Sequence, residues 1–205
     1  MNLSRRDLFN ILPAGAASCL GCAGAALCAA QAEPQSTPQA PPPGPSAKAD
    51  MTWEQVFNFS YRGYARRMKK VSLRIGDEQF LKVLREASSE ATAESSADLL
   101  KSAPSRDLAT LTLYLKTQMT TAPMYRAALV WETVEQSPAA FEIHVSQCLW
   151  AKTFRAKDAA EIGYATICYP DYAITTAFSP KLKLVRTKTL MQGHDCCNHR
   201  WVMES

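Results

Sequence analysis

The sequence lacks the signatures of several large protein classes. It contains 8 glycines in 205 residues, and none of them builds a glycine-rich phosphate-binding loop. No segment is repeated along the chain, and strands do not alternate with helices as they do in parallel sheets. The sequence therefore does not predict a repeat protein or a doubly wound nucleotide-binding fold.

The chain also lacks a strong charge imbalance. It carries 23 Lys and Arg against 19 Asp and Glu, for a net charge of +4. Residues 1–32 hold two arginines and one aspartate, so the remainder keeps a net charge of about +3, with basic and acidic residues interspersed. This balance gives no reason to expect a nucleic-acid partner.

The N-terminal segment lacks a hydrophobic run of the length that usually spans a membrane. The weakly apolar stretch 11–30 is short for a spanning helix. It follows Arg5 and Arg6 in "SRRDLF", which fits the twin-arginine export pattern. Small residues at Ala30 and Ala32 suit a signal peptidase, so we expect residues 1–32 to be a cleaved signal peptide.

Such a signal predicts that the protein meets the twin-arginine export machinery and works in the periplasm or another extracytoplasmic compartment. It also predicts contact with a membrane only through the signal segment. One alternative is an uncleaved amphipathic anchor. Another is a lipid-modified cysteine among Cys19, Cys22 and Cys28.

The rest of the chain divides into a linker and a folded part. Residues 33–50 hold six of the 12 prolines and no large apolar residue, so we expect an extended linker there. Residues 51–205 are long enough for one ordinary core. That leaves a single folded domain after the linker.

The first half of this domain has helical periodicity. Thr52 and Gln55 predict a reciprocal capping box at the start of a helix that reaches about Lys70. Further helices are predicted over residues 77–100 and 105–119, each with an apolar stripe. We expect these three helices to serve as scaffold.

The second half mixes strands and helices. The alternating pattern of residues 140–146 predicts a half-buried strand that pairs with the strand before it in a hairpin. The predicted order is strands over 128–137 and 140–146, helices over 147–156 and 158–168, and strands over 182–189 and 196–203. Pro170 is expected to end the second of these helices. The fold class is therefore α+β: N-terminal helices followed by antiparallel β-hairpins with intervening helices.

Cys148 is the first candidate for a reactive residue. If Ser146 caps the helix that follows the hairpin, Cys148 lies in its first turn. Free backbone N–H groups and the helix dipole stabilise a thiolate there, which favours a nucleophile or a thiolate ligand. The alternative is a small buried apolar residue.

Cys168 and Asp171 in "CYPD" form a second candidate group. An antiparallel pair of short helices would bring Cys168 near Cys148. In an oxidising compartment the two thiols could form a disulfide. The four cysteines after residue 140 allow three complete pairings, and the sequence does not choose among them.

The last strand contributes a third group. Strand periodicity places Cys197, His199 and Trp201 on one face, while Cys196 lies on the other. A Cys and a His on one face can share a metal or act as nucleophile and base, although the spacing is not that of a zinc ribbon.

The other two histidines are weaker candidates. His144 could join the site with Glu142 or could simply be solvated, and His194 and Asp195 are expected in the turn before the last strand.

Several of these residues form a recognisable pattern. It consists of Cys148 before "WAKTF", the "CYPD" of Cys168 to Asp171, "FSPKLKLVRTKTLMQG" ending at Gly193, and Cys197. Over about residues 127–203 this pattern resembles the L-2-amino-thiazoline-4-carboxylic acid hydrolase family. Residues 51–126 match only as a generic helical lead-in. The resemblance implies hydrolytic opening of a cyclic thiazoline amino acid to N-carbamoyl-cysteine. It carries over Cys148, Cys168, Asp171 and Cys197, with Arg186 and Gly193 shaping the final hairpin.

Two functional hypotheses follow. The first is an exported hydrolase that opens a small cyclic substrate bonded through C–N and C–S. Its nucleophile is Cys148 or a zinc-bound water, His199 moves protons, and Asp171 orients a partner or the substrate. The second is a non-catalytic exported module that binds a metal or a small ligand. The ligands of a metal, with zinc the possible ion, are Cys148, Cys168, Cys197 and His199.

Overall fold

The computed structural model describes residues 51–204, apart from the side chains of Asp98 and Leu99. The predicted signal peptide, its cleavage site and the linker lie outside the described residues.

The N-terminal helices form largely where the sequence predicts them. Helix α2 (Trp53–Ile75) begins with the capping box of Thr52 and Gln55, which confirms that prediction, and it runs five residues beyond the expected end. Gly76 follows with a φ of +90°, a conformation that favours glycine, and turns the chain into α3 (Asp77–Ser95). The predicted second helix is divided at Ser96, after which α4 (Ala97–Ser102) begins.

Two further helices lead to the sheet. Helix α5 (Leu108–Thr121) begins three residues later than predicted, because Asp107 and not Ser105 accepts the first free N–H group, from Thr110. Helix α6 (Pro123–Ala128) was not predicted and connects α5 to the first strand. Pro123 occupies its first turn, where a missing N–H group costs nothing.

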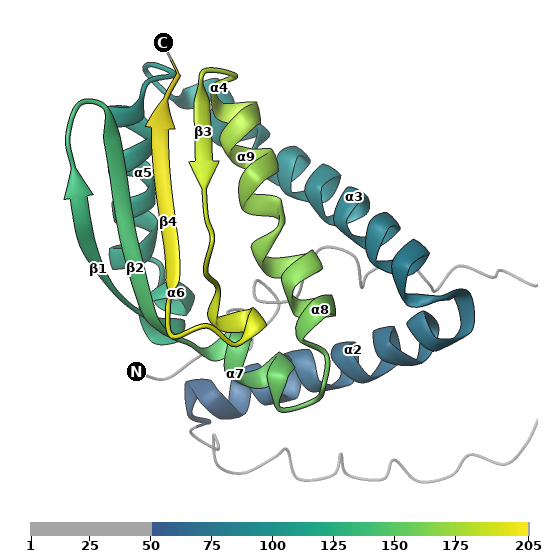
Figure 1. Cartoon of the computed structure of the whole chain (residues 1–205). Helices are drawn as coiled ribbons and strands as arrows, with labels where there is room; N and C mark the ends of the chain where they lie inside the picture. Colours follow the sequence, from purple (N-terminus) through teal and green to yellow (C-terminus); the bar gives the residue numbers. More distant parts are fainter. Residues whose placement is uncertain (1–50, 205) are drawn as a thin grey trace, which may run out of the picture. The chain divides into compact units, whose positions relative to one another are not determined.

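The four described strands form one antiparallel sheet, which confirms the α+β class. The strands are β1 (Leu129–Gln136), β2 (Ala140–Cys148), β3 (Leu182–Val185) and β4 (Cys197–Met203). Their spatial order is β1-β2-β4-β3, so β4 lies between β2 and β3 (Figure 1). Strand β3 is four residues shorter than predicted, because the Asn198 side chain accepts the N–H groups of Thr187 and Lys188.

The helical segment after residue 158 differs most from the prediction. Helix α8 (Ala160–Gly163) passes into the π-helix η1 (Tyr164–Cys168), and α9 (Pro170–Phe178) continues from there. The prediction that Pro170 ends the helix was wrong. Tyr169 donates to the carbonyl of Tyr164, five residues back, and the wider turn lets the chain pass Pro170 in helical conformation.

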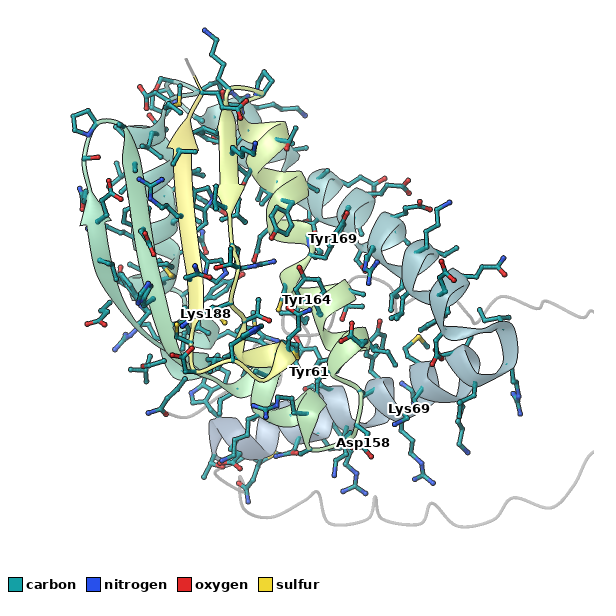
Figure 2. All side chains as sticks on the ribbon, viewed as in Figure 1. Tyr61, Lys69, Asp158, Tyr164, Tyr169 and Lys188 are labelled. Atoms are coloured by element: carbon teal, nitrogen blue, oxygen red, sulfur yellow. The ribbon has the colours of Figure 1, made fainter. Side chains whose placement is uncertain are left out.

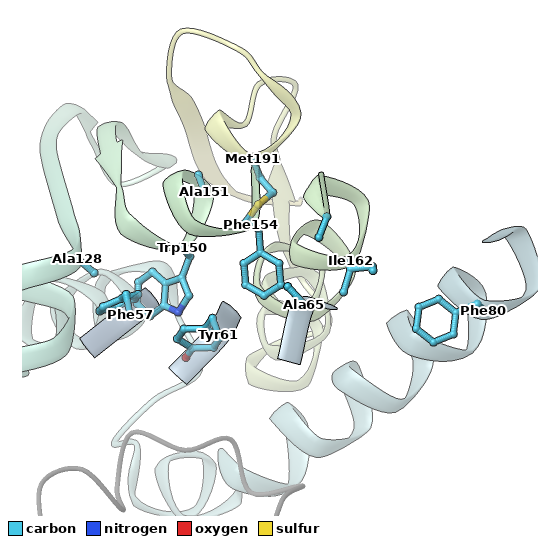
Figure 3. Packing of buried hydrophobic residues seen from close by; sticks show 11 residues of the cluster. Phe57, Tyr61, Ala65, Phe80, Ala128, Trp150, Ala151, Phe154, Ile162 and Met191 are labelled. Atoms are coloured by element: carbon cyan, nitrogen blue, oxygen red, sulfur yellow. The ribbon is translucent and has the colours of Figure 1, made fainter. Parts of the chain in front are cut away.

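The lower part of the domain packs around aromatic side chains. Helix α7 (Leu149–Arg155) lies against α2, and Trp150 meets the Phe57 ring edge-on at a centroid distance of 4.8 Å. Lys69 on α2 donates to the carbonyl of Asp158 at 2.7 Å, which joins α2 to the turn after α7 (Figure 2). Figure 3 shows Phe154 between Met191 and Ala65 at the centre of this cluster.

A second cluster fills the space under the sheet. The inward side chains of β2, Phe141, Ile143 and Val145, pack with Leu111 of α5 and Phe178 of α9. Their burial confirms the alternation predicted for residues 140–146. One face of the sheet is thus covered by helices. In the part of the chain described here, no helix combines the length and the apolar character needed to cross a membrane.

Candidate functional site

The two faces of β4 separate its side chains as predicted. Cys197, His199 and Trp201 stand opposite Val145, Ile143 and Phe141 of β2, on the face that packs against the helices. The Trp201 ring stacks on His199 and on Phe141 at centroid distances of 5.7 Å each. Trp201 Nε1 also donates to Thr175 Oγ1 on α9 at 3.1 Å. These contacts fix the His199 ring against the inner face of the sheet.

Arg186 is the centre of the polar cluster on this face. The residue directly follows β3, and its side chain is only 1% exposed. Nη1 donates to Asp171 Oδ2 at 2.7 Å and lies 3.0 Å from His199 Nε2, while Nη2 donates to the Cys168 carbonyl at 2.7 Å. Arg186 therefore joins the π-helix, α9 and β4 through three polar contacts.

The π-helix explains why the Cys168 carbonyl can take part. In a regular α-helix this carbonyl would accept the N–H group of Tyr172, four residues ahead. Here the Tyr172 N–H group donates to Tyr169 instead, at 3.1 Å. The carbonyl of Cys168 is then free to accept Arg186. The same irregular turn sets Asp171 in the first turn of α9, with its side chain toward the guanidinium.

The Arg186 guanidinium contacts the His199 imidazole. A guanidinium can only donate hydrogen bonds, so Nη1 is the donor in this contact. Nδ1 is buried and has no partner among the described protein atoms, and the same holds for Arg186 Nε. His199 Nε2 thus contacts both members of the ion pair, at 3.0 Å from Arg186 Nη1 and 3.6 Å from Asp171 Oδ2.

Aromatic rings complete the surroundings of Arg186. Its guanidinium lies over the rings of Tyr172 and Tyr164, at 4.9 and 5.7 Å from their centroids. Burial is the largest single influence on the pKa of Arg186 and would lower it, but Asp171, Cys168 and Tyr172 together raise it above its ordinary value. The cluster thus holds a permanent buried cation whose counterion is Asp171. The Asp171 side chain itself remains 40% exposed.

Cys148 lies at the end of β2, where the two core clusters meet. It caps α7 itself: its Sγ accepts the N–H group of Ala151 at 3.4 Å. The expected cap, Ser146, instead donates to the Val130 carbonyl, so this detail of the prediction was wrong.

Burial of Cys148 outweighs the stabilisation that was predicted for its thiolate. Burial raises the pKa of Cys148 to about 11, and the nearby Cys197 and Asp171 add to the rise, whereas the N–H group of Ala151 lowers it less. In the free protein Cys148 is therefore a protonated thiol.

The other two inner thiols behave alike. Burial raises the pKa of Cys168 well above its usual value, with Asp171 adding to the rise and Arg186 opposing it. Burial also raises the pKa of Cys197, whose Sγ accepts the N–H group of Leu190 at 3.1 Å. Leu190 belongs to the short 3-10 helix η2 (Leu190–Gln192). All four cysteines between residues 51 and 204 are free, so the structure contains no disulfide between Cys148 and Cys168.

The predicted zinc site does not fit this geometry. Within residues 51–204, no three or more His, Cys, Asp and Glu side chains are grouped so that they could hold a metal ion. His199 Nε2 faces a permanent cation, and the sulfur atoms of Cys148 and Cys197 accept backbone N–H groups. We therefore derive no chemical step through a metal.

The remaining candidates lie away from the cluster. His144 stands opposite Asn198 on the outer face of the sheet and contacts Glu142 Oε1 at 3.0 Å, so the structure does not bring it into the site. His194 and Asp195 lie in the turn before β4, as predicted, and Asp195 pairs with Lys188. Gly193 ends η2 with a φ of +96°, in agreement with its expected role in shaping the final hairpin.

A model of the L-2-amino-thiazoline-4-carboxylic acid hydrolase family matches residues 57–201. The chain belongs to this family. Membership extends further than the motifs suggested, because the match includes most of α2 and all of α3 to α6, which resembled the hydrolase family only as generic helices. No curated protein matches the chain.

For this hydrolase-family protein, the side-chain contacts of Arg186 were not predicted from the sequence. It was expected to shape the hairpin, whereas its side chain is buried and joins Asp171 to His199. The aromatic neighbours Tyr164 and Tyr172 were not singled out. The one available signal was an arginine directly after an apolar strand.

Proposed function

We propose that this protein is an exported hydrolase that opens a small cyclic amidine-like substrate, of which 2-amino-thiazoline-4-carboxylate is the first candidate. The observation that carries the proposal is the unequal exposure of the polar cluster. Asp171 is 40% exposed, while its partners Arg186 and His199 are 1% and 14% exposed. Export rests on the twin-arginine pattern at Arg5 and Arg6.

Asp171 is suited to bind the amidine part of such a substrate. Arg186 holds Oδ2 in place, so the carboxylate is oriented before the substrate arrives. Its other oxygen, Oδ1, has no hydrogen-bond partner among the described protein atoms and can accept the N–H groups of the substrate's amino-imine unit. Charge-assisted bonds of this kind are stronger than neutral ones. By binding the nitrogen next to the ring carbon, Asp171 positions that carbon for attack.

Cys148 is the proposed nucleophile, and substrate binding is what activates it. In the free protein the charge of Asp171 helps to keep the thiol protonated. A cationic amidinium paired with Asp171 cancels that effect and adds positive charge near the sulfur, and both changes lower the pKa of Cys148. The thiolate therefore forms only when a substrate is bound.

The reaction then balances without any further reagent. The Cys148 thiolate adds to the ring carbon between nitrogen and sulfur, the bond from that carbon to the ring sulfur breaks, and the released sulfur takes up the proton that the thiol lost. Water then adds to the same carbon and releases Cys148. The product is the N-carbamoyl amino thiol.

The test measures thiol release from 2-amino-thiazoline-4-carboxylate. We expect turnover by the native protein and by Cys196→Ala, since Cys196 lies before β4 and is partly exposed, and a loss of at least about a hundredfold in Cys148→Ala. Retained turnover in Cys148→Ala would exclude the thiol as nucleophile. Substrate binding without turnover by the native protein would favour the non-catalytic binding module.

The pH dependence offers a second check. Substrate-induced activation predicts that kcat rises with pH through a lower pKa than kcat/KM, because kcat reports the complex and kcat/KM the free protein. For kcat/KM the controlling pKa should lie near that of free Cys148, about 11. Coinciding pKa values in the two profiles would contradict activation by the substrate.

A further inference from the structure

The exposed side of α2 concentrates positive charge in a way that the overall charge balance hides. Six basic residues lie between positions 62 and 74, whereas Glu54 at the other end is the only acidic residue of the helix and pairs with Lys152 at 2.9 Å. The six are Arg62, Arg66, Arg67, Lys69, Lys70 and Arg74. One face of a single helix therefore carries more excess charge than the whole chain.

This face also forms a groove on the protein surface. It has a volume of about 570 Å³ and is lined by Arg62, Arg66, Lys69, Lys70 and Leu73 of α2, together with Lys157 from the turn after α7. Asp158 is the nearby acidic residue, and its carboxylate lies 4.0 Å from Lys69. Figure 2 shows Lys69 and Asp158 at this side of α2. The other basic side chains of the groove have no ion pair within the described part of the chain.

Two large apolar side chains stand on the same face. Phe59 and Leu73 are 72% and 73% exposed. Phe59, Arg66 and Leu73 are spaced seven residues apart, close to two helical turns each, so they share one side of α2. The buried side of the helix carries Phe57, Tyr61 and Ala65 instead.

We propose that this face of α2 docks onto the surface of an anionic lipid bilayer. Cations at phosphate level together with apolar side chains that enter the acyl boundary are the two contributions that hold an interfacial helix. A nucleic acid or an acidic peptide would use the cations but would place its own charges against exposed Phe59 and Leu73. The bilayer is the anionic partner that uses both kinds of side chain. This inference is independent of the proposed hydrolase activity, and it departs from the sequence-based expectation that only the signal segment contacts a membrane.

The test compares variants of the full chain in sedimentation with vesicles of phosphatidylglycerol and phosphatidylcholine. All variants keep the same N-terminal segment, so differences report on α2. Arg62→Gln, Arg66→Gln and Lys70→Gln combined should weaken partitioning on the order of 100-fold, since each basic residue at the surface contributes about fivefold. The matched control, Lys82→Gln, Lys101→Gln and Lys181→Gln, removes the same charge from exposed positions elsewhere and should change binding about twofold or less.

A second pair of variants distinguishes a bilayer from other polyanions as the binding partner. Phe59→Ser with Leu73→Ser should weaken vesicle binding by about tenfold or more, while Leu113→Ser with Val134→Ser, also exposed, should not. Equal binding by the cationic variant and its control would overturn the proposal. So would unchanged vesicle binding by the Phe59 and Leu73 variant, or tighter binding of the native protein to a DNA duplex than to the vesicles.

Discussion

The two faces of the sheet carry similar sets of side chains in opposite surroundings. On the inner face Arg186 contacts Asp171 and His199. On the outer face Arg200 contacts Glu135 at 3.0 Å and Glu142 at 3.6 Å, and Glu142 contacts His144 at 3.0 Å.

Burial is what distinguishes the two clusters. The Arg186 side chain is 1% exposed and that of Arg200 is 39% exposed. Water screens the outer ion pairs, so they contribute little, whereas the inner cation has lost its hydration and depends on its partners. Residue types alone therefore do not identify a site. The same arginine, carboxylate and histidine acquire chemical significance only where the fold removes water from them.

The largest expected difference between the faces is in catalysis. Asp171→Asn keeps the size of the side chain but removes the charge that we assign to substrate recognition, so thiazoline hydrolysis should fall by about 100- to 1000-fold. Glu142→Gln makes the same chemical change on the outer face and should leave the rate within about twofold. Circular dichroism of both variants checks that the fold persists. Equal effects of the two substitutions would remove the inner face as the site of chemistry.

The next difference concerns stability. Arg186→Ala leaves the Cys168 carbonyl and one Asp171 oxygen without their donor, and we expect a loss of about 3 kcal/mol in the free energy of unfolding. Arg200→Ala removes screened pairs and should cost about 1 kcal/mol or less. Urea unfolding of both variants measures the two values. A cost for Arg200→Ala equal to that for Arg186→Ala would show that burial does not separate the clusters.

The comparison also explains what the sequence could predict. Alternation along residues 140–146 and along β4 depends only on the period of a strand, so the shared face of Cys197 and His199 followed from it. The Thr52 capping box is equally local. Local rules of this kind identified the strands and the residues that face inward.

The parts that were missed depend on contacts between distant segments. Pro170 was expected to end a helix, but the π-helix before it uses a hydrogen bond from Tyr169 to Tyr164 and keeps the chain helical. That irregular turn frees the Cys168 carbonyl for Arg186, 18 residues away. The charge of α2 was missed for a different reason, since averaging over the chain conceals a face that exists only once the helix is formed.

The adjacent cysteines Cys196 and Cys197 provide the smallest and most local comparison. Cys197 is 7% exposed and its sulfur accepts the Leu190 N–H group, while Cys196 lies just before β4 and is partly exposed. Burial raises the pKa of both thiols, so access of the reagent decides between them. We expect Cys196 to react with iodoacetamide at least about tenfold faster than Cys197 in the folded protein.

Two single variants resolve the neighbouring thiols. Alkylation is followed on the peptides of residues 51–204, because Cys19, Cys22 and Cys28 lie outside this range. Cys196→Ser should remove the fast phase there. Cys197→Ser should leave it in place, because the other remaining thiols, Cys148 and Cys168, are buried and have raised pKa values. Unfolding in urea should make all remaining thiols react at one rate, which serves as the control. A fast phase that survives Cys196→Ser would mean that solvent reaches the inner face of β4, and the contrast between the two faces would then rest on charge alone.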